Sequence, residues 1–244
     1  MLPEEYAKLD AIEDTHWWFH GLRANLTKAL EPSQTHSGSR LLDAGCGTGA
    51  TIRHFRKAFP QLHCIGTDVD ESACRLARGK GGGLVCISSV NGLPFRTASF
   101  DVIISADVLC HSGVDVDAAL ADFLRTLKPG GVLVLSLPAY QWMMSFHDRA
   151  VSTVRRFNRT QLQSWLKRAG YTCVRATYWN TLLFPLMVLH RKLGNQNASS
   201  DVRAVAPPIN AIFRGVMRIE NKLLRWGILL PFGGSVLVTA RRPS

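Results

Sequence analysis

Acidic residues are scarce in the last two fifths of this 244-residue sequence. Residues 149–244 carry sixteen Lys and Arg side chains and only two acids, Asp201 and Glu220, which is a local charge of +14. The first 148 residues hold 13 basic and 16 acidic side chains. This asymmetry predicts an anionic partner for the C-terminal part, whether a substrate, a membrane surface or a nucleic acid. Charge alone does not choose among the three.

Closely spaced cysteine pairs and long apolar runs are also missing. Without a CxxC or similar spacing, neither a metal site nor a disulfide framework is indicated, so we expect reduced thiols and a cytoplasmic location. The longest apolar run, 182–189, contains Pro185 and is too short to span a bilayer. The first twenty residues are acidic and lack a continuous apolar core, so we expect no secretory signal. The cysteines are Cys46, Cys64, Cys74, Cys86, Cys110 and Cys173.

With 46% apolar and 19% charged residues, the chain is typical of a folded protein, and its apolar segments alternate between strand and helix patterns. This order favours an α/β architecture with an open, doubly wound, seven-stranded sheet. We expect one helix over 4–31. The expected strands are 40–44, 63–67, 84–88, 100–105, 132–137, 172–178 and 235–240. The expected later helices are 50–58, 71–78, 118–127 and 160–169.

The sequence divides into four predicted parts. They are an N-terminal helical cap (1–39), a core with the first six strands (40–178), a helical insertion (179–234), and the last strand of the core (235–244). The insertion has 56 residues, far more than the two to five that usually join neighbouring antiparallel strands. We therefore expect it to have structure and a role of its own.

The first chemical motif is a glycine-rich turn between a strand and a helix, Asp43-Ala44-Gly45-Cys46-Gly47-Thr48-Gly49. Glycines allow a tight turn and a close approach to a ligand, and the helix that follows presents free amides. The segment also satisfies GxGxxA, which leaves a nicotinamide or flavin dinucleotide as a competitor. Asp43 argues against a dinucleotide, because it would repel a pyrophosphate and attract a cationic amino-acid group.

Two further motifs follow in order. Asp68 ends the second strand, 19 residues after Gly49, where an acid can accept hydrogen bonds from ribose hydroxyls. Asp70 is predicted to cap the next helix. The segment from Ser89 to Phe95 (SVNGLPF) then precedes Ser99-Phe100-Asp101, which opens the fourth strand.

Taken together, these motifs and the Lys128-Pro129-Gly130-Gly131 turn closely resemble class I S-adenosylmethionine-dependent methyltransferases, in particular the small-molecule group with an LPF…SFD segment. The resemblance is strong over residues 40–137. It implies a Rossmann-like sheet whose last strand is antiparallel, S-adenosylmethionine as cofactor, S-adenosylhomocysteine as product, and no metal. The implied cofactor-binding residues are Asp43, Gly45, Cys46, Gly47, Asp68, Val69, Ser89, Val90 and Asp107. Ser89 stands where the family often has an acid facing the adenine amino group.

The methyl acceptor should lie beyond the carboxyl ends of strands four and five. Candidate catalytic residues there are His111, His147 and Tyr140, with Asp148 as a possible orienting acid for His147. A base is needed only if the acceptor atom starts protonated, and histidine titrates in the right range for that role. Arg155, Arg156 and Arg159 are either an anion clamp or a solvated basic face. Trp17, Trp18 and Phe19 are a packing cluster or an aromatic lid.

The insertion predicts an amphipathic helix over 208–227 and a shorter apolar segment over 182–193. A stripe of bases (Arg214, Arg218, Lys222 and Arg225) lies beside an apolar stripe (Ile209, Ile212, Val216, Ile219, Leu223 and Trp226). Such a helix either docks on the sheet as a substrate cover or lies on an anionic membrane surface. Glu220 falls close to the apolar side, so we expect a buried partner such as an arginine.

The leading functional hypothesis is methyl transfer to a small-molecule or lipid-like acceptor, apolar or anionic, by a cytoplasmic protein with possible peripheral membrane contact. A dinucleotide-dependent oxidoreductase and a non-catalytic cofactor-binding subunit are the alternatives. Nucleic acid ranks lower as a partner, because no RNA-binding motif is recognisable.

Overall fold

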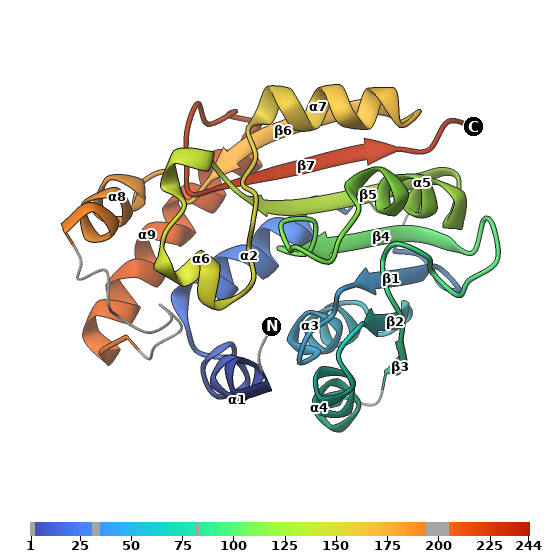
Figure 1. Ribbon diagram of the computed structural model, residues 1–244, viewed down its shortest axis with the longest axis horizontal. Helices are drawn as coiled ribbons and strands as arrows, with labels where there is room; N and C mark the ends of the chain where they lie inside the picture. Colours follow the sequence, from blue (N-terminus) through green and yellow to red (C-terminus); the bar gives the residue numbers. More distant parts are fainter. Residues whose placement is uncertain (1–2, 31–34, 82, 194–204) are drawn as a thin grey trace.

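A computed structural model describes residues 3–30, 35–81, 83–193 and 205–244. Its centre is a seven-stranded sheet in the order β3-β2-β1-β4-β5-β7-β6 (Figure 1). Neighbouring strands pair in parallel from β3 to β5, and β7 pairs antiparallel with both β5 and β6. The predicted doubly wound sheet with an antiparallel last strand is confirmed. The strands are β1 (Arg40–Ala44), β2 (His63–Asp68), β3 (Leu84–Ile87), β4 (Phe100–Ala106), β5 (Leu127–Pro138), β6 (Thr172–Trp179) and β7 (Ser235–Arg241).

Helices cover both faces of the sheet and give two apolar cores. On one face, α5 (Val116–Thr126) and α7 (Arg159–Arg168) bury Phe123 and Leu166. On the other, α2 (Trp17–Lys28), α3 (Ala50–Ala58) and α9 (Pro207–Arg225) bury Leu26, Phe55 and Met217. The central strands are nearly continuous apolar runs because both faces are covered. The other helices among the described residues are α1 (Pro3–Ile12), α4 (Glu71–Gly81), α6 (Phe146–Ala150), α8 (Phe184–Leu193) and the 3₁₀ turn Gln141–Met143.

The N-terminal segment forms two helices, so the prediction of one helix over 4–31 is wrong. α1 ends at Ile12, and His16 caps α2 by accepting a hydrogen bond from the Trp18 N–H. The break arises because Glu13 and Asp14 turn toward distant partners. Glu13 contacts Thr48 and Lys80, and Asp14 pairs with Arg53. These contacts join residues far apart in the sequence, which a local pattern does not reveal.

The insertion places α8 and α9 at the end of the sheet where the parallel strands finish and β7 begins (Figure 1). The face of α9 that is buried carries Met217, Glu220 and Leu224. Much of the expected docking stripe is exposed instead, including Ile212, Ile219 and Trp226. The polar segment between the two helices lies mostly outside the described residues.

Glu220 is fully buried, and its partner is the backbone rather than the expected arginine. Its carboxylate accepts hydrogen bonds from the N–H groups of Asn180, Thr181 (2.7 Å) and Leu182 (2.9 Å), at the turn that follows β6. Burial raises the pKa of Glu220, while the three amides oppose that rise by favouring the charged form. Three directed donors can satisfy a buried carboxylate without a counter-charge. The carboxylate therefore joins α9 to the sheet.

Replacing Glu220 by Gln should destabilise the protein, because one carboxylate oxygen would become an NH2 donor and leave at least one of the three backbone N–H groups without an acceptor. An unsatisfied buried donor costs about 1–3 kcal/mol, which corresponds to a fall in Tm of at least about 2–4 °C for a chain of this size. Thermal unfolding measures the effect. Glu71→Gln is the matched control, since Glu71 pairs with Arg75 on the surface and its loss should change the free energy of unfolding by less than about 0.5 kcal/mol. Equal Tm values for the two variants would contradict the role given to Glu220.

Candidate functional site

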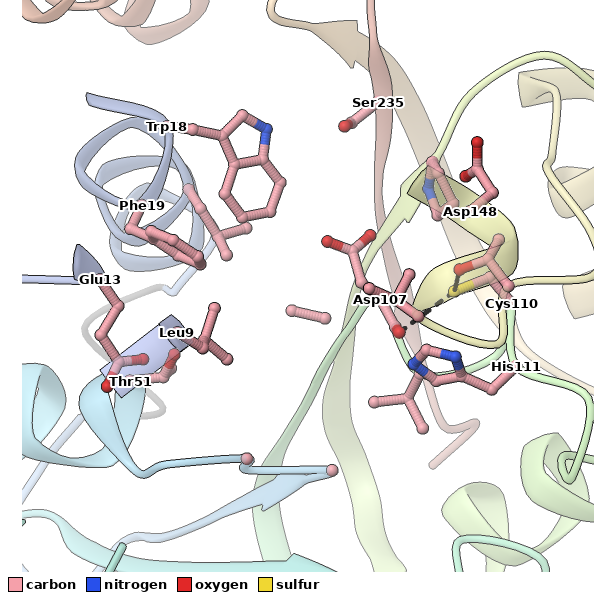
Figure 2. Close-up of a pocket in the computed structure, with 18 of the residues that line it drawn as sticks. Leu9, Glu13, Trp18, Phe19, Thr51, Asp107, Cys110, His111, Asp148 and Ser235 are labelled. Atoms are coloured by element: carbon pink, nitrogen blue, oxygen red, sulfur yellow. Dashed lines mark hydrogen bonds between the residues drawn. The ribbon is translucent and has the colours of Figure 1, made fainter. Parts of the chain in front are cut away.

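A cavity of about 980 Å³ lies at the carboxyl ends of the parallel strands. Its walls come from the turns after β1, β2 and β4, from α1 and the start of α2, and from α8 and α9. Figure 2 shows Leu9, Glu13, Trp18 and Phe19 on one wall and Asp107, Cys110 and His111 on the opposite wall. The volume suits a drug-sized ligand with room for part of a second molecule.

The glycine-rich turn enters this cavity and depends on the absence of side chains. Gly45 and Gly49 have φ values of +86° and +85°, in the left-handed region that favours glycine. A Cβ on Gly45 would collide with Val108, and one on Gly49 would collide with Ala77. Gly47 differs, because a Cβ there would meet no atom within 4 Å, and its N–H donates to Asp68 Oδ2 at 2.9 Å. The turn thus offers the cavity open space beside exposed backbone.

Two acids stand at the turn. Asp43 is buried, and its Oδ2 has no hydrogen-bond partner among the described residues. Burial raises the pKa of Asp43 to about 7, and the nearby charges of Asp68 and Glu13 push in the same direction. Asp68 accepts from Gly47 and, through Oδ1, from the Asp70 N–H at 3.1 Å. Such a cluster of carboxylates around an unpaired oxygen suits a cationic or hydrogen-bond-donating ligand group.

The neighbouring wall presents an apolar side chain and a hydroxyl. Val69 lines the cavity although it is 71% exposed, which leaves its side chain free to pack against a flat ligand ring. Ser89 and Val90 line the same region, and the Ser89 oxygen accepts from the Asn91 N–H at 3.2 Å. Asp70 accepts from the Ala73 N–H at 3.0 Å, as expected of a cap at the start of α4. Cys46 also lines the cavity, and burial raises the pKa of its thiol.

Asp107 and His111 stand at the end of β4 and converge on the cavity. Asp107 is held in a left-handed conformation, with φ of 54°, and its Oδ1 has no partner among the described residues. Burial raises its pKa to about 7, which the Arg156 charge opposes and the Asp148 charge reinforces. His111 Nδ1 is likewise without a partner, and burial lowers the pKa of the imidazole. A neutral imidazole can accept a proton at neutral pH.

The other sequence candidates lie differently. Asp148 forms a buried pair with Arg156 (2.7 Å) and accepts from Ser145, so its carboxylate is held by groups other than His147. Burial would raise the pKa of Asp148, but Arg156 and Arg191 hold it below its usual range. The His147 side chain lies outside the described residues.

The three arginines and Tyr140 do not converge on one ligand. Arg155 donates to the Val114 carbonyl, and Arg159 lies over the Tyr178 ring. Arg156 alone of the three lines the cavity. Tyr140 is absent from the cavity lining and stacks on Tyr178, with ring centroids 5.2 Å apart.

The far end of the cavity is apolar, and most of its residues were missed from the sequence. Leu183, Leu186, Met187 and Phe213 line it together with Trp17. Trp17 and Phe213 meet edge to face at 5.4 Å, and Trp18 packs on Trp179 at 5.4 Å. The N-terminal aromatic residues therefore both pack and line the cavity. The sequence signal that could have identified Phe213 is its spacing from Met217 and Leu224 along α9. These three residues form a second apolar stripe, shorter than the stripe that contains Ile212 and Ile219.

No group of three or more His, Cys, Asp or Glu side chains is arranged to hold a metal ion within the described ranges. The cavity instead joins an acidic end at β1 and β2, a central pair of unsatisfied groups at β4, and an apolar end at α8 and α9. In an open α/β sheet this edge is where ligands bind.

Comparison with known proteins places this geometry in a family. Residues 15–176 match the model of a family described as "Methyltransferase domain". A Bos taurus protein named "Probable tRNA methyltransferase 9B" is 31% identical over 144 residues, which is 57% of this chain and 30% of that relative. The malonyl-[acyl-carrier protein] O-methyltransferase of Serratia marcescens is 29% identical over 174 residues, 68% of this chain and 66% of that relative. The chain thus spans less than a third of the bovine relative and about two thirds of the bacterial one.

Solved structures share the whole fold. A Haloferax volcanii methyltransferase, determined in complex with the Trm112 methyltransferase activator, superposes with a TM-score of 0.64 at 18% identity and covers 98% of both chains. At that identity the likeness concerns the fold alone. With the family match over residues 15–176 and the fold shared from end to end, the chain belongs to the class I S-adenosylmethionine-dependent methyltransferases.

Proposed function

We propose that this protein transfers a methyl group from S-adenosylmethionine to a small acceptor that has an apolar, lipid-like part. The observation that carries the proposal is one cavity with two unlike ends. Unsatisfied carboxylates and the glycine turn line one end, and apolar side chains of α2, α8 and α9 line the other. A charged nucleoside suits the first end, and an apolar acceptor suits the second.

The residues at the acidic end fit the cofactor. The unpaired Asp43 oxygen would bind the ammonium group of S-adenosylmethionine. The open space at Gly47 would let the cofactor lie directly against the backbone of the turn. Asp68 would bind the ribose, with Val69 and Val90 against the adenine and the Ser89 hydroxyl near its amino group. Gly45, Cys46 and Asp107 would complete the methionine side. When bound, S-adenosylmethionine supplies an electrophilic methyl group on a sulfonium and leaves as S-adenosylhomocysteine.

At the centre of the cavity, His111 is proposed to hold and accept the proton of an acceptor hydroxyl. Burial keeps its imidazole neutral, and Nδ1 has no partner among the described residues, so a lone pair or N–H is available to the acceptor. The cavity walls would supply most of the remaining rate enhancement by positioning the acceptor, because in-line methyl transfer depends on orientation. Tyr140 and His147 stay as further sequence-based candidates.

The relatives leave the acceptor open. Their names refer to tRNA, to malonyl-[acyl-carrier protein] and to the biosynthesis of ubiquinone and menaquinone. An apolar acceptor is favoured here because Trp17, Leu183, Leu186, Met187 and Phe213 line the cavity where α2, α8 and α9 form its wall. Turnover should be assayed on a panel of long-chain hydroxy compounds, quinol analogues, short carboxylic acids and tRNA. Methylation of tRNA alone would overturn the lipid-like assignment. If the wild type bound NAD and did not bind S-adenosylmethionine, the result would favour the oxidoreductase alternative.

Affinity for S-adenosylmethionine should rise as pH increases through about 7. The free carboxyl of Asp43 has a pKa of about 7, and only its ionised form attracts an ammonium group. Calorimetry between about pH 5.5 and pH 7.5 measures this, a range in which the ligand amine stays largely protonated. Asp43→Asn should bind at least about tenfold more weakly at pH 7.5. Its pH profile should be shallower than that of the wild type, with the remaining slope due to Asp107, whose pKa is also about 7.

Asp117→Asn, an exposed change on α5, is the matched control and should keep the wild-type profile. Wild-type affinity that is independent of pH, or full affinity in Asp43→Asn, would contradict the place given to the amino group.

Replacing His111 by Ala should lower kcat by about 10²–10⁴-fold for a hydroxyl acceptor, the usual contribution of a general base. Affinity for S-adenosylhomocysteine should stay near wild type, because the acidic end remains intact. His63→Ala is the matched control, since His63 is exposed at the start of β2, far from the carboxyl ends of the strands. Unchanged turnover in His111→Ala would mean that methyl transfer works by positioning alone. No turnover by the wild type on any acceptor would favour a non-catalytic cofactor-binding subunit.

A further inference from the structure

An apolar patch is exposed on the outer side of the insertion. Trp226 is 75% exposed, Leu229 63% and Ile219 58%, which is unusual for side chains of this size on one surface. Here the apolar patch means six exposed residues: Trp142, Leu182, Ile219, Trp226, Leu229 and Phe232. Exposed apolar groups of this kind mark a surface that another apolar body covers.

Contacts between the elements hold the patch together. Glu220 binds the Leu182 N–H, which brings the turn after β6 next to the helical turn that carries Ile219. Phe184 then touches Phe232 at 5.9 Å and Trp142 at 6.1 Å between ring centroids. Trp226 and Leu229 lie on the segment that joins Ile219 to Phe232 along the chain. The six residues therefore form one surface around Phe184 and the end of α9.

Positive charge borders this surface without acidic neighbours from the same half of the chain. Arg218, Lys222 and Arg225 are exposed on the solvent side of α9. Within the described residues from 149 onward, Glu220 is the one acid, and it is buried and bound to backbone amides. An apolar surface beside uncompensated bases matches the interface of an anionic lipid bilayer, where apolar groups enter the acyl boundary and bases meet phosphates.

The patch also adjoins the apolar end of the cavity. Leu183 lines the cavity immediately after Leu182 of the patch. Leu186 lines it as well and is half exposed, so the cavity reaches the surface beside α8. No described helix is long and apolar enough to cross a membrane.

We propose that this patch docks the protein on an anionic membrane surface, with α9 lying in the interface and the cavity opening toward the lipid. Docking itself is independent of the proposed methyl transfer. Only the corollary, that an apolar acceptor enters from the bilayer beside α8, rests on the proposed function.

Co-sedimentation of the full chain with vesicles tests the docking. The two probes are vesicles of phosphatidylcholine alone and vesicles of equal parts phosphatidylcholine and phosphatidylglycerol. The wild type should pellet with the anionic vesicles at ~0.05 M salt and much less at ~0.5 M salt, because salt screens the attraction between exposed charges. Binding to the neutral vesicles should be at least about tenfold weaker.

Two double variants separate the apolar and the charged contributions. Trp226→Ser with Leu229→Ser should lose more than about tenfold in binding to anionic vesicles. Lys222→Glu with Arg225→Glu should do the same and should remove the preference for anionic lipid. Matched controls come from the other end of the sheet: Leu84→Ser, at an equally exposed residue of β3, and Lys57→Glu with Arg75→Glu. The controls should bind vesicles nearly as the wild type does.

Each variant should keep its Tm and its affinity for S-adenosylhomocysteine, since none of these side chains lines the cavity. Absence of pelleting with either vesicle, or equal losses in the patch and control variants, would overturn the docking. A dimer of the wild type that Trp226→Ser dissociates, without vesicle binding, would assign the patch to a second copy of the chain instead. Methyl transfer measured on a detergent-dispersed acceptor is read separately, so failure of one proposal does not conceal failure of the other.

Discussion

The carboxylate of Glu220 is the interaction on which the C-terminal half depends. It accepts hydrogen bonds from three consecutive backbone N–H groups just after β6 and thereby fixes the C-terminal part of α9 against the sheet edge. With α9 placed, Phe213 meets Trp17, and Asn210 binds the backbone of Thr15 and Trp17 at the joint between α1 and α2. One buried anion thus orders the insertion, the N-terminal helices and the apolar end of the cavity together. The same orientation of α9 turns Ile219 and Trp226 toward solvent.

Much of the sheet could be predicted because its signals are local. The strand that ends at Asp43 and the glycine turn after it combine an apolar run with residues that need a left-handed backbone, and both features are read within ten residues. The insertion was harder to predict, because α9 carries two apolar stripes that lie more than about a third of a turn apart. The sequence predicts that the stripe with Ile212, Ile219 and Trp226 is buried. In the structure the buried residues are Met217 and Leu224, on the same side of the helix as Glu220. Burying a Glu without partners is costly, so the sequence predicted an arginine beside Glu220. Backbone N–H groups can take that place, but their positions cannot be identified from the sequence.

Three acids that line the cavity, Asp43, Asp107 and Asp148, differ in pKa for a physical reason. Asp148 has two arginines and a serine hydroxyl, so its charge is stabilised. Asp43 and Asp107 have unpaired oxygens and like-charged neighbours, and their pKa values stand near 7. The fold therefore satisfies Asp148 and leaves Asp43 and Asp107 each with an oxygen that has no partner among the described residues. This is the pattern expected where stability is given up for binding.

The attachment of α1 has a consequence for the rate at which ligands exchange. Tyr6, Leu9, Ile12 and Glu13 close the acidic end of the cavity, yet no described residue of α1 belongs to either apolar core. Polar contacts hold this region instead, among them the pairs of Lys80 with Asp10 and Glu13 and of Arg53 with Asp14. A helix attached in this way can detach as a unit while the sheet stays folded. A ligand at the acidic end would then enter and leave by the opening of α1, and ionic strength would change the rate of that opening by screening the ion pairs that hold the region.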